Sequence, residues 1–394
     1  MKILHTADWH LGQVLCNFDR QEEQLSMLSQ IQAIVEQEKP DVFVLAGDIY
    51  DVAQPSAVVQ KMFNDAILSL HHACPEMTIV CISGNHDSGT RHIVYQNPWK
   101  DLRVYVAGTI QREQPENHII EIPGKGFVVA VPYAAERLMP EGFYQSLYDI
   151  VAERNTENLP VVLTAHLALK ACDPTGNSIS DNYIGGIECA DAADFSRYDY
   201  VALGHIHKPQ FVDKAQRIRY AGTPIPISFD EVYPGCEHSV SIVEIDHQGE
   251  QPRLTTIDIQ NPRPLVTISV KGTESLKEVS QEIAAFPKEN KAYIRLNVEV
   301  PQGTTLPYGD GDIRHLLQDK QANFCYINSV RESQPKQESN SEKENEPMTV
   351  SDFQHLNPMD VMERWFKSQN KEFTDECRQM FHEVENRLEG QANQ

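Results

Sequence analysis

The sequence predicts an α/β protein, and three observations support this fold class. Short β-branched runs alternate with amphipathic helical patterns over about the first 260 residues. The length of 394 residues is enough for two or three domains. Prolines at positions 262 and 264 interrupt the pattern, and a shorter mixture of strand and helix patterns follows. We therefore expect a large α/β domain over residues 1–262 and a small α+β domain over residues 263–330.

Several runs in the first domain have the length and the β-branched composition of strands. They span residues 2–8, 41–48, 78–85, 127–132, 160–166, 200–207, 217–223 and 239–246. The segment from His118 to Pro132 carries Gly124 and Gly126 near its middle, which predicts a β-hairpin. The sheets should therefore contain both parallel and antiparallel pairs.

Two segments between the first three strands show helical periodicity. They run from Asp19 to Glu38 and from Ser56 to His72. Their apolar positions are Leu25, Leu28, Ile31, Ile34 and Val35 in the first, and Val59, Phe63, Ile67 and Leu70 in the second. In the second domain, residues 265–272 and 292–300 read as strands around a helix over residues 276–286.

The C-terminal part has a different composition. Residues 331–351 are mostly polar and cannot offset their ordering entropy by burial, so they are expected to form a flexible linker. Helical periodicity returns over residues 352–390, with apolar stripes at Met359, Met362, Trp365 and Phe366 and at Met380, Phe381, Val384 and Leu388. Such a tail either packs on its own domain or docks on a partner. We favour the partner, because a self-packing tail seldom needs a free linker.

Charge and cysteine content restrict the function classes. The formal net charge of -23 argues against binding nucleic acid through a general basic surface. It still permits a nucleic-acid enzyme whose metal ions or partner supply local positive charge. The eight cysteines form no C-x-x-C pair, which predicts reduced thiols in a cytoplasmic protein. No signal peptide and no apolar run of about 18 residues is recognisable, so no membrane span is expected.

Candidate metal ligands follow five of the predicted strands. Open α/β folds build their sites at the carboxyl ends of strands, and Gly47, Gly84 and Gly204 permit sharp turns there. One such side chain alone could be a helix cap or a satisfied core histidine, but five strand ends repeat the pattern. The residues are Asp8 and His10, Asp48 and Asp51, Asn85, His86 and Asp87, His166, and His205 and His207.

The residue types indicate which metals would bind. Asp, Asn and His without a thiolate suit Mn²⁺, Fe²⁺ or Zn²⁺ better than a closed structural zinc site. The candidate ligands are too many for one ion with an open position, so we infer two ions that clamp a phosphate and activate a water. In the final block we expect the isoleucine between His205 and His207 to place both imidazoles on one side of an extended chain.

The order D-x-H, G-D-x-x-D, G-N-H-D, H and G-H-x-H resembles that of the calcineurin-like metallophosphoesterases. The resemblance implies a four-layer α/β/β/α sandwich with a small capping domain and a C-terminal helical partner-binding tail. The segments "ILHTADWHLG" and "PMDVMERW" are similar to those of nuclease subunits in this superfamily that work with a partner ATPase.

The resemblance also implies roles for individual residues. One ion is expected on Asp8, His10, Asp48 and His207, and the other on Asp48, Asn85, His166 and His205, with Asp48 as the bridge. His86 would face the scissile phosphate and protonate the leaving oxygen or stabilise its charge. Asp87 would orient His86. Asp51 stands where some relatives carry a histidine, and is expected to hydrogen-bond the ligand network.

The implied activity is that of a Mn²⁺-dependent DNA nuclease, a 3′–5′ exonuclease on double strands and an endonuclease on single strands and hairpins. ATP would gate it through the ATPase, bound by residues 352–390 in a heterotetramer. A homodimer is also implied, through residues 57–72 and the segment after Gly89, although the apolar pattern there fits packing on the sheet equally well. Arg91 and Lys208 could contact DNA, whereas Lys214, Arg217 and Arg219 could line a DNA path or lie on a solvated hairpin.

Other functions of the same fold stay open. A phosphodiesterase or phosphatase could act on nucleotides or phosphoproteins. Against a phosphoprotein phosphatase, the second block reads "GDIYDVA" instead of GDxxDRG, and the third reads "GNHD" instead of GNHE. A small-molecule enzyme would have no use for the apolar-striped tail. A non-catalytic scaffold is disfavoured, because every ligand position is filled.

Overall fold

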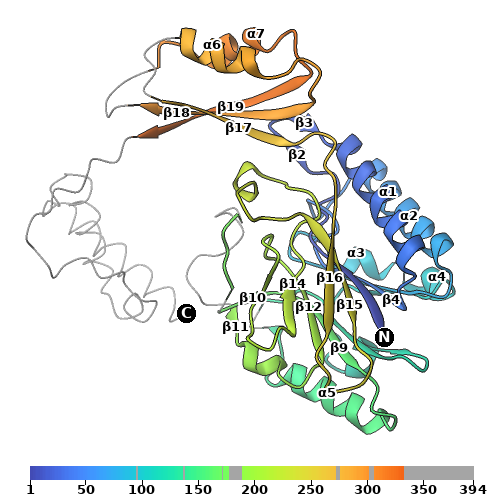
Figure 1. The fold of residues 1–394 in the computed structure, drawn as a ribbon. Coiled ribbons are helices and arrows are strands. Elements are labelled where there is room, and N and C mark those ends of the chain that lie inside the picture. The colour runs from blue at the N-terminus through green and yellow to red at the C-terminus, as the bar shows by residue number, and fades with distance from the viewer. Residues whose placement is uncertain are drawn as a thin grey trace, which may run out of the picture. The chain divides into compact units, whose positions relative to one another are not determined.

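A computed structural model of the chain describes residues 1–94, 96–135, 138–170, 172–176, 189–271, 276–300 and 306–331. Residues Met1–Ser333 form one compact unit (Figure 1). Arg331, the first residue of the predicted linker, is the last residue of a strand. The rest of the predicted linker and the helical segment predicted over residues 352–390 lie outside the described residues.

The first of two large sheets contains six strands in the order β16-β15-β1-β4-β5-β6. The strands β1, β4, β5 and β6 are parallel, whereas β15 and β16 are antiparallel to their neighbours. Their bounds are β1 (Lys2–Thr6), β4 (Val42–Ala46), β5 (Thr78–Ile82), β6 (Val104–Ala107), β15 (Ser239–Glu244) and β16 (Arg253–Asp258).

The second sheet has the order β13-β14-β12-β9-β8-β7 and also mixes both pairings. Strands β7 and β8 form the hairpin predicted around Gly124, with Ile122 opposite Gly126. The bounds are β7 (Ile119–Ile122), β8 (Gly126–Val131), β9 (Val161–His166), β12 (Tyr200–Gly204), β13 (Gln210–Phe211) and β14 (Ile218–Tyr220). Two small ribbons pair β2 (Val14–Leu15) with β3 (Phe18–Asp19) and β10 (Ala168–Leu169) with β11 (Cys189–Ala190).

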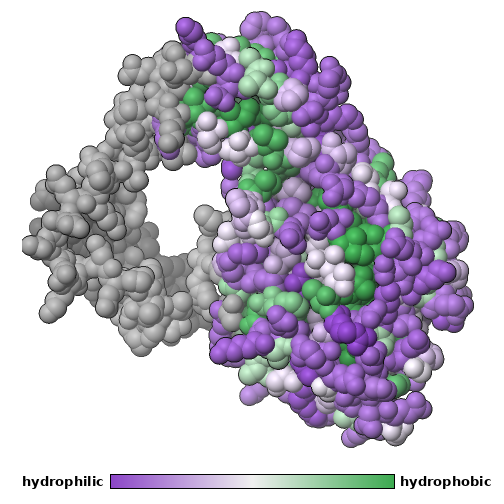
Figure 2. Space-filling view, viewed as in Figure 1, coloured by the Kyte–Doolittle hydropathy of each residue, from purple (hydrophilic) through white to green (hydrophobic). Residues whose placement is uncertain are grey.

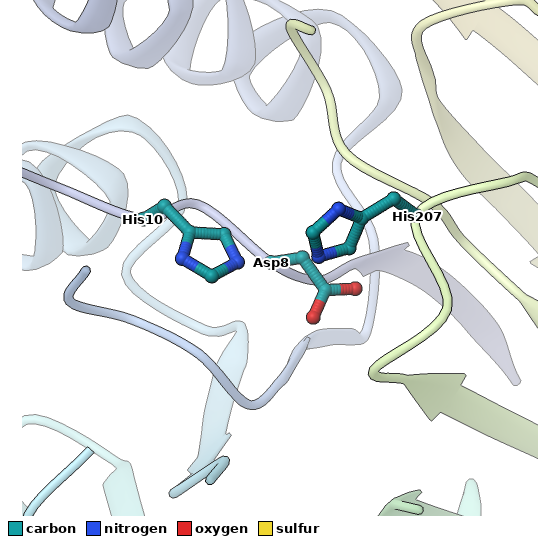
Figure 3. A group of neighbouring side chains, drawn as sticks. All are labelled: Asp8, His10 and His207. Atoms are coloured by element: carbon teal, nitrogen blue, oxygen red, sulfur yellow. The ribbon is translucent and has the colours of Figure 1, made fainter. Parts of the chain in front are cut away.

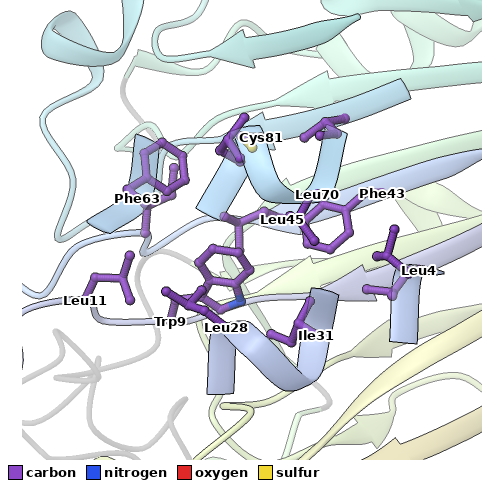
Figure 4. Packing of buried hydrophobic residues seen from close by; sticks show 14 of the residues in the cluster. Leu4, Trp9, Leu11, Leu28, Ile31, Phe43, Leu45, Phe63, Leu70 and Cys81 are labelled. Carbon is purple, nitrogen blue, oxygen red and sulfur yellow. The ribbon is translucent and has the colours of Figure 1, made fainter. Parts of the chain in front are cut away.

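Helices cover the outer faces of both sheets. The predicted stripes on α1 (Gln21–Glu38) and α2 (Ala57–Ala73) pack on the first sheet in a core that includes Trp9, Phe43 and Phe63 (Figure 4). The prediction is wrong for Leu25, which is 48% exposed on α1. Helix α5 (Phe143–Arg154) packs on the second sheet, and a third core fills the space between the sheets. The predicted four-layer α/β/β/α sandwich is confirmed. Shorter helices are α3 (Gly89–Ile93), α4 (Gln96–Lys100), η1 (Pro115–His118), η3 (Ala192–Phe195) and η4 (Phe229–Glu231).

Residues 265–331, called the cap below, form a three-stranded parallel sheet. Its strands are β17 (Leu265–Lys271), β18 (Ala292–Val300) and β19 (Ala322–Arg331), with helices α6 (Leu276–Ala285) and α7 (Asp310–Leu316) between them. Apolar side chains of the helices and strands, including Val279, Ile283 and Ile313, form a separate core. The sheet and its two helices are seen in Figure 1.

Specific contacts join the cap to the sandwich. Tyr293 and Cys325 of the cap share a small apolar cluster with Leu15 and Phe229. Lys291 Nζ lies 2.5 Å from Glu22 Oε1 on α1. Arg295 Nη1 lies 2.7 Å from Asp230 Oδ1 on η4. The ribbon β2–β3, helix α1 and helix η4 thus provide the seat of the cap.

Hydrophilic residues dominate the face seen in Figure 2, with hydrophobic ones gathered in small patches between them. This agrees with the strongly acidic composition of the chain. Among the helices in the described part of the chain, none combines the length and the hydrophobicity needed to cross a membrane.

Candidate metal centre

The candidate ligands meet where strands of both sheets end. Asp8 and His10 follow β1, Asp48 follows β4, and Asn85 follows β5 of the first sheet. The second sheet contributes His166, the last residue of β9, and the two histidines after β12. Backbone hydrogen bonds from Asp8 N to Gly47 O and from His10 N to Asp48 O, both 3.0 Å, hold the first two loops together.

The backbone at several ligand positions is strained. Asp8, His10, Asp48 and His205 have φ values of 52°, 43°, 47° and 94°. Side chains with a Cβ atom rarely adopt this left-handed region, and each such residue costs about 1–3 kcal/mol. The expectation that His205 and His207 lie on an extended chain is wrong, because β12 ends at Gly204 and the chain turns at His205.

One ligand group consists of Asp8, His10 and His207. A ligand atom from each lies within 4.8 Å of those of the other two. Figure 3 shows the side chains of Asp8, His10 and His207 gathered together, and the ring centroids of His10 and His207 are 5.2 Å apart. His10 is 1% exposed, yet neither of its ring nitrogens has a hydrogen-bond partner among the described residues.

A second group centres on Asn85. Its Oδ1 atom lies 2.9 Å from His166 Nε2 and also 2.9 Å from His205 Nδ1. The centroids of the two imidazole rings are 5.2 Å apart. Three potential ligand atoms from three strand ends therefore point to one place.

Asp48 lies between the two groups. Its Oδ2 atom is 3.3 Å from His166 Nε2 and 3.8 Å from His10 Nε2, and its Oδ1 atom accepts a 2.9 Å hydrogen bond from the backbone N–H of His86. These distances suit the bridging position expected for Asp48.

Burial and mutual charge shift the pKa values in opposite directions. Burial raises the pKa of Asp8, against the influence of His166 and His207. Burial also opposes ionisation of Asp48, but His166 and then His10 outweigh it and hold the pKa of Asp48 well below its usual range. Burial disfavours the His166 cation, yet Asp48 and Asp8 overcome this and raise the pKa of His166 to about 9. The site thus concentrates negative charge that a cation can neutralise.

Outer partners fix the orientation of three imidazoles. Nδ1 of His166 lies 2.8 Å from Ala46 O, and Nδ1 of His86 lies 2.9 Å from Asp51 O. A carbonyl only accepts, so each Nδ1 carries the hydrogen and donates. His207 directs its Nδ1 to Glu231 Oε1 at 3.1 Å. In each ring the Nε2 atom is then the one suited to bind a metal or substrate.

Asp87 was expected to orient the His86 imidazole, but its carboxylate contacts backbone amides instead. Its Oδ2 atom accepts from Gly84 N at 2.8 Å and Ile49 N at 3.1 Å, and its Oδ1 atom accepts from Tyr50 N at 3.0 Å. Because these amides belong to the loops after β4 and β5, the carboxylate fastens the two loops together. Asp51 contributes both its carbonyl to His86 and its carboxylate, 3.3 Å from His10 Nδ1.

Two of the predicted glycines are required by close packing. A Cβ atom on Gly84 would lie 2.1 Å from Asp48 Oδ1, and one on Gly204 would lie 2.0 Å from Ala46 O. Such distances are far below any tolerated contact. Residues with side chains at these positions would therefore displace the metal loops.

The candidate DNA-contacting residues differ in their surroundings. Arg91 is exposed on α3. Lys208 pairs with Asp173, and its Nζ atom lies 5.5 Å from the centroid of Tyr233. The suggested path along Lys214, Arg217 and Arg219 is wrong for the last of these. Arg219 is 7% exposed, stacks on Phe211 and donates to Ser241 Oγ.

Two residues of the site were missed by sequence reasoning. Glu231 is 2% exposed and accepts from His207, Thr223 and Ile227 N. Gln24 on α1 donates to His10 O and accepts from Gly12 N, each at 3.0 Å. Neither belongs to a local motif, and both reach the ligands only through the tertiary fold.

The residues present fit divalent cations. Leaving a buried polar atom without a hydrogen bond costs about 1–3 kcal/mol, and a cation at His10 would supply the missing interaction. Carboxylates, an amide oxygen and imidazoles form a donor set typical of borderline divalent metals. The described cluster therefore meets the chemical requirements of a two-metal site.

Sequence comparisons agree with this geometry. The family model described as calcineurin-like phosphoesterase matches residues 1–209. The SbcD subunit of the nuclease SbcCD from Rhodobacter capsulatus is 30% identical over 335 residues, which cover 76% of this chain and 81% of that protein. The SbcD subunit from Bacillus subtilis is 28% identical, with coverage of 85% and 87%. The SbcD subunit from Escherichia coli K12 is 26% identical, with coverage of 72% and 76%. The chain therefore belongs to the calcineurin-like phosphoesterase family, among the relatives of the SbcD nuclease subunits.

Proposed function

We propose that this protein is the nuclease subunit of an SbcCD-type complex and hydrolyses DNA phosphodiester bonds with two bound Mn²⁺ ions. The observation that carries the proposal is the buried His10 imidazole, which makes no hydrogen bond to any described residue although carboxylates and histidines surround it. The names of the relatives support the nuclease assignment.

The ligand sets that we propose follow the two groups described above. One ion would be held by Asp8, His10, Asp48 and His207. The other would be held by Asp48, Asn85, His166 and His205. Asp48 suits the bridge because its Oδ2 atom lies near a histidine of each group, 3.3 Å from His166 Nε2 and 3.8 Å from His10 Nε2.

The bound ions would supply a Lewis acid for the phosphate and would lower the pKa of a water molecule. The other contributions come from the chain itself. His86 projects from the loop after β5, and its Nδ1 is held by Asp51 O, so Nε2 can face the departing oxygen and give it a proton. Asp87 keeps this loop aligned with the loop of Asp48.

We further propose a 3′–5′ exonuclease activity on double strands and an endonuclease activity on single strands and hairpins. Arg91 is an exposed cation close in sequence to His86 and could contact a DNA phosphate. Lys208 could do so only by releasing Asp173. With a net charge of -23, the chain needs additional positive surface from elsewhere.

An SbcC-type ATPase is the partner that we propose for residues 352–390, in a heterotetramer gated by ATP. The apolar stripes of that segment and the names of the relatives support it. A homodimer remains a prediction, because Phe63 and Ile67 of α2 already pack in the core. Among the described cysteines, Cys16, Cys74, Cys81, Cys236 and Cys325 form no disulfide, which supports a cytoplasmic location.

The decisive experiment incubates labelled DNA hairpins and linear duplexes with the protein and Mn²⁺, with and without the ATPase and ATP. We expect cleavage that increases with the partner and disappears on chelation of the metal. An Asp48→Ala variant, which removes the bridge, serves as the inactive control. If DNA stays intact with the partner present while a small phosphodiester is hydrolysed, the DNA assignment is wrong.

A further inference from the structure

Helix η4 touches both the cap and the candidate metal centre through consecutive residues. Phe229 and Asp230 face the cap, whereas the next residue, Glu231, holds the metal-ligand candidate His207. One turn of 3₁₀-helix therefore joins the two parts of the molecule. The tight geometry of such a turn leaves little room for independent movement of its residues.

The contacts on the cap side are apolar as well as ionic. Phe229 is 2% exposed and packs edge-to-face on Tyr326 with a centroid distance of 5.8 Å. Arg295 lies over the Phe229 ring at 5.1 Å and also pairs with Asp230 at 2.7 Å. A change in the position of β18 or β19 would thus move η4.

The contacts on the metal side are hydrogen bonds to the buried carboxylate of Glu231. Glu231 Oε1 lies 3.1 Å from His207 Nδ1. The other carboxylate oxygen accepts from Thr223 Oγ1 at 2.7 Å and from Ile227 N at 3.1 Å. This arrangement keeps the hydrogen on Nδ1 of His207 and its lone pair on Nε2, the tautomer that metal binding requires.

We propose that Glu231 is a positioning residue for His207 and that η4 couples the seating of the cap to metal affinity at Asp8, His10 and His207. This inference rests on the proposed metal site, but not on the identity of the substrate. A cap displaced from η4 would loosen Glu231 and lower the affinity of that ion. A correctly seated cap would hold the site ready for it.

The test measures Mn²⁺ binding to the full chain by isothermal titration calorimetry. We expect Glu231→Gln to weaken the affinity by about 10-fold or more, as for other outer partners of metal-binding histidines. Arg295→Ala, which removes both cap contacts of its side chain, should weaken it by about 3- to 10-fold. Lys291→Ala is the matched control. Lys291 lies just before the same strand, and its contact with Glu22 on α1 is away from η4. Removing this contact should leave the Mn²⁺ affinity unchanged.

A second readout separates positioning from general destabilisation. In protein labelled with ¹⁵N-histidine, His207 should show a protonated Nδ1 and an unprotonated Nε2, and this signature should be lost in Glu231→Gln. If that variant unfolds, Thr223→Val removes the donor to Glu231 instead and should also lower the affinity. Unchanged affinity and signature in the Glu231 variant would disprove its role. Equal affinities of the Arg295 and Lys291 variants would disprove the coupling.

DNA hydrolysis is measured separately on the same samples. The expected order of Mn²⁺ affinities, without any DNA cleavage by the unaltered chain in the presence of the ATPase and ATP, would defeat the proposed function and support the coupling. DNA cleavage by the unaltered chain together with equal Mn²⁺ affinities in all variants would defeat the coupling alone.

Discussion

At the scale of single residues, His86 is the side chain that we propose as the proton donor to the leaving oxygen. Its Nδ1 is occupied by Asp51 O, and its ring centroid lies 4.9 Å from that of His10. We expect His86→Ala to lower the rate of phosphodiester hydrolysis by about 10²- to 10⁴-fold, the usual contribution of an acid–base group. Mn²⁺ stoichiometry, measured by equilibrium dialysis, should stay at the value of the unaltered chain. Loss of one bound ion would make His86 a ligand instead.

Gly84 gives a second test at this scale, because its role is purely steric. A methyl group there would meet Asp48 Oδ1 at 2.1 Å and Asp48 N at 2.4 Å. Relaxing such overpacking costs about 1–3 kcal/mol and must shift the loop of Asp48. Gly84→Ala should therefore lose high-affinity Mn²⁺ binding and unfold at a lower temperature. The control is Gly311→Ala, because no atom of the described residues lies within 4 Å of a Cβ at that position. Equal behaviour of the two variants would refute the steric argument.

At the scale of elements, His5 of β1 ties the two sheets together. Its Nε2 lies 3.2 Å from Leu203 O on β12, so Nε2 donates, and its Nδ1 accepts from Tyr200 at 2.9 Å. Burial, assisted by Arg219, lowers the pKa of His5 to about 3. The folded state therefore holds His5 neutral, while the unfolded state binds a proton below about pH 6.5. The contribution of His5 to the free energy of unfolding is therefore fully present above about pH 6.5 and decreases as the pH falls toward 3.

This linkage can be measured in urea unfolding curves at pH 8 and pH 5. His5 alone should cost about 2 kcal/mol of unfolding free energy over that interval. His5→Gln, which cannot titrate, should be less stable at pH 8 but lose about 2 kcal/mol less on acidification. Parallel pH profiles of the two proteins would show that His5 titrates in the folded state.

The sequence was a good guide to elements that carry an uninterrupted apolar pattern. Strands such as β1, β4 and β5 and helices α1 and α2 lie where periodicity placed them, since their patterns match the faces that they bury. Helix α5 and the third cap strand β19 were not anticipated. Their apolar residues only form a face once the second sheet and the cap helices are in place.

The residues of the candidate metal centre can also be divided into those that the sequence predicted and those that it did not. The ligands were predictable because each lies at the end of a strand or within four residues after it. The hydrogen bonds of Asp87 to the neighbouring loop and of Glu231 to His207 were not predictable, because the partners lie up to 38 residues away in sequence. Backbone amides as hydrogen-bond partners also leave no signature in residue types.

At the scale of the whole molecule, the compact unit is complete without the C-terminal segment. β19 ends at Arg331, and residues Met1–Ser333 contain both sheets, the cap and all the candidate ligands. Truncation after Ser333 should therefore preserve Mn²⁺ affinity and hydrolysis of a small phosphodiester. If residues 352–390 dock on the ATPase, the same truncation should abolish capture of an SbcC-type ATPase in a pull-down.

Because of the acidic net charge, the truncation should also affect DNA cleavage. A chain with a formal charge of -23 gains little from phosphate contacts by itself. ATP-stimulated cleavage of a DNA hairpin should thus fall to the level of the isolated chain once the ATPase cannot bind. A matched variant with Met359→Ala and Trp365→Ala in the full chain tests the stripe directly and should show the same loss. Undiminished ATPase capture by the truncated chain would show that the docking surface lies within residues 1–333.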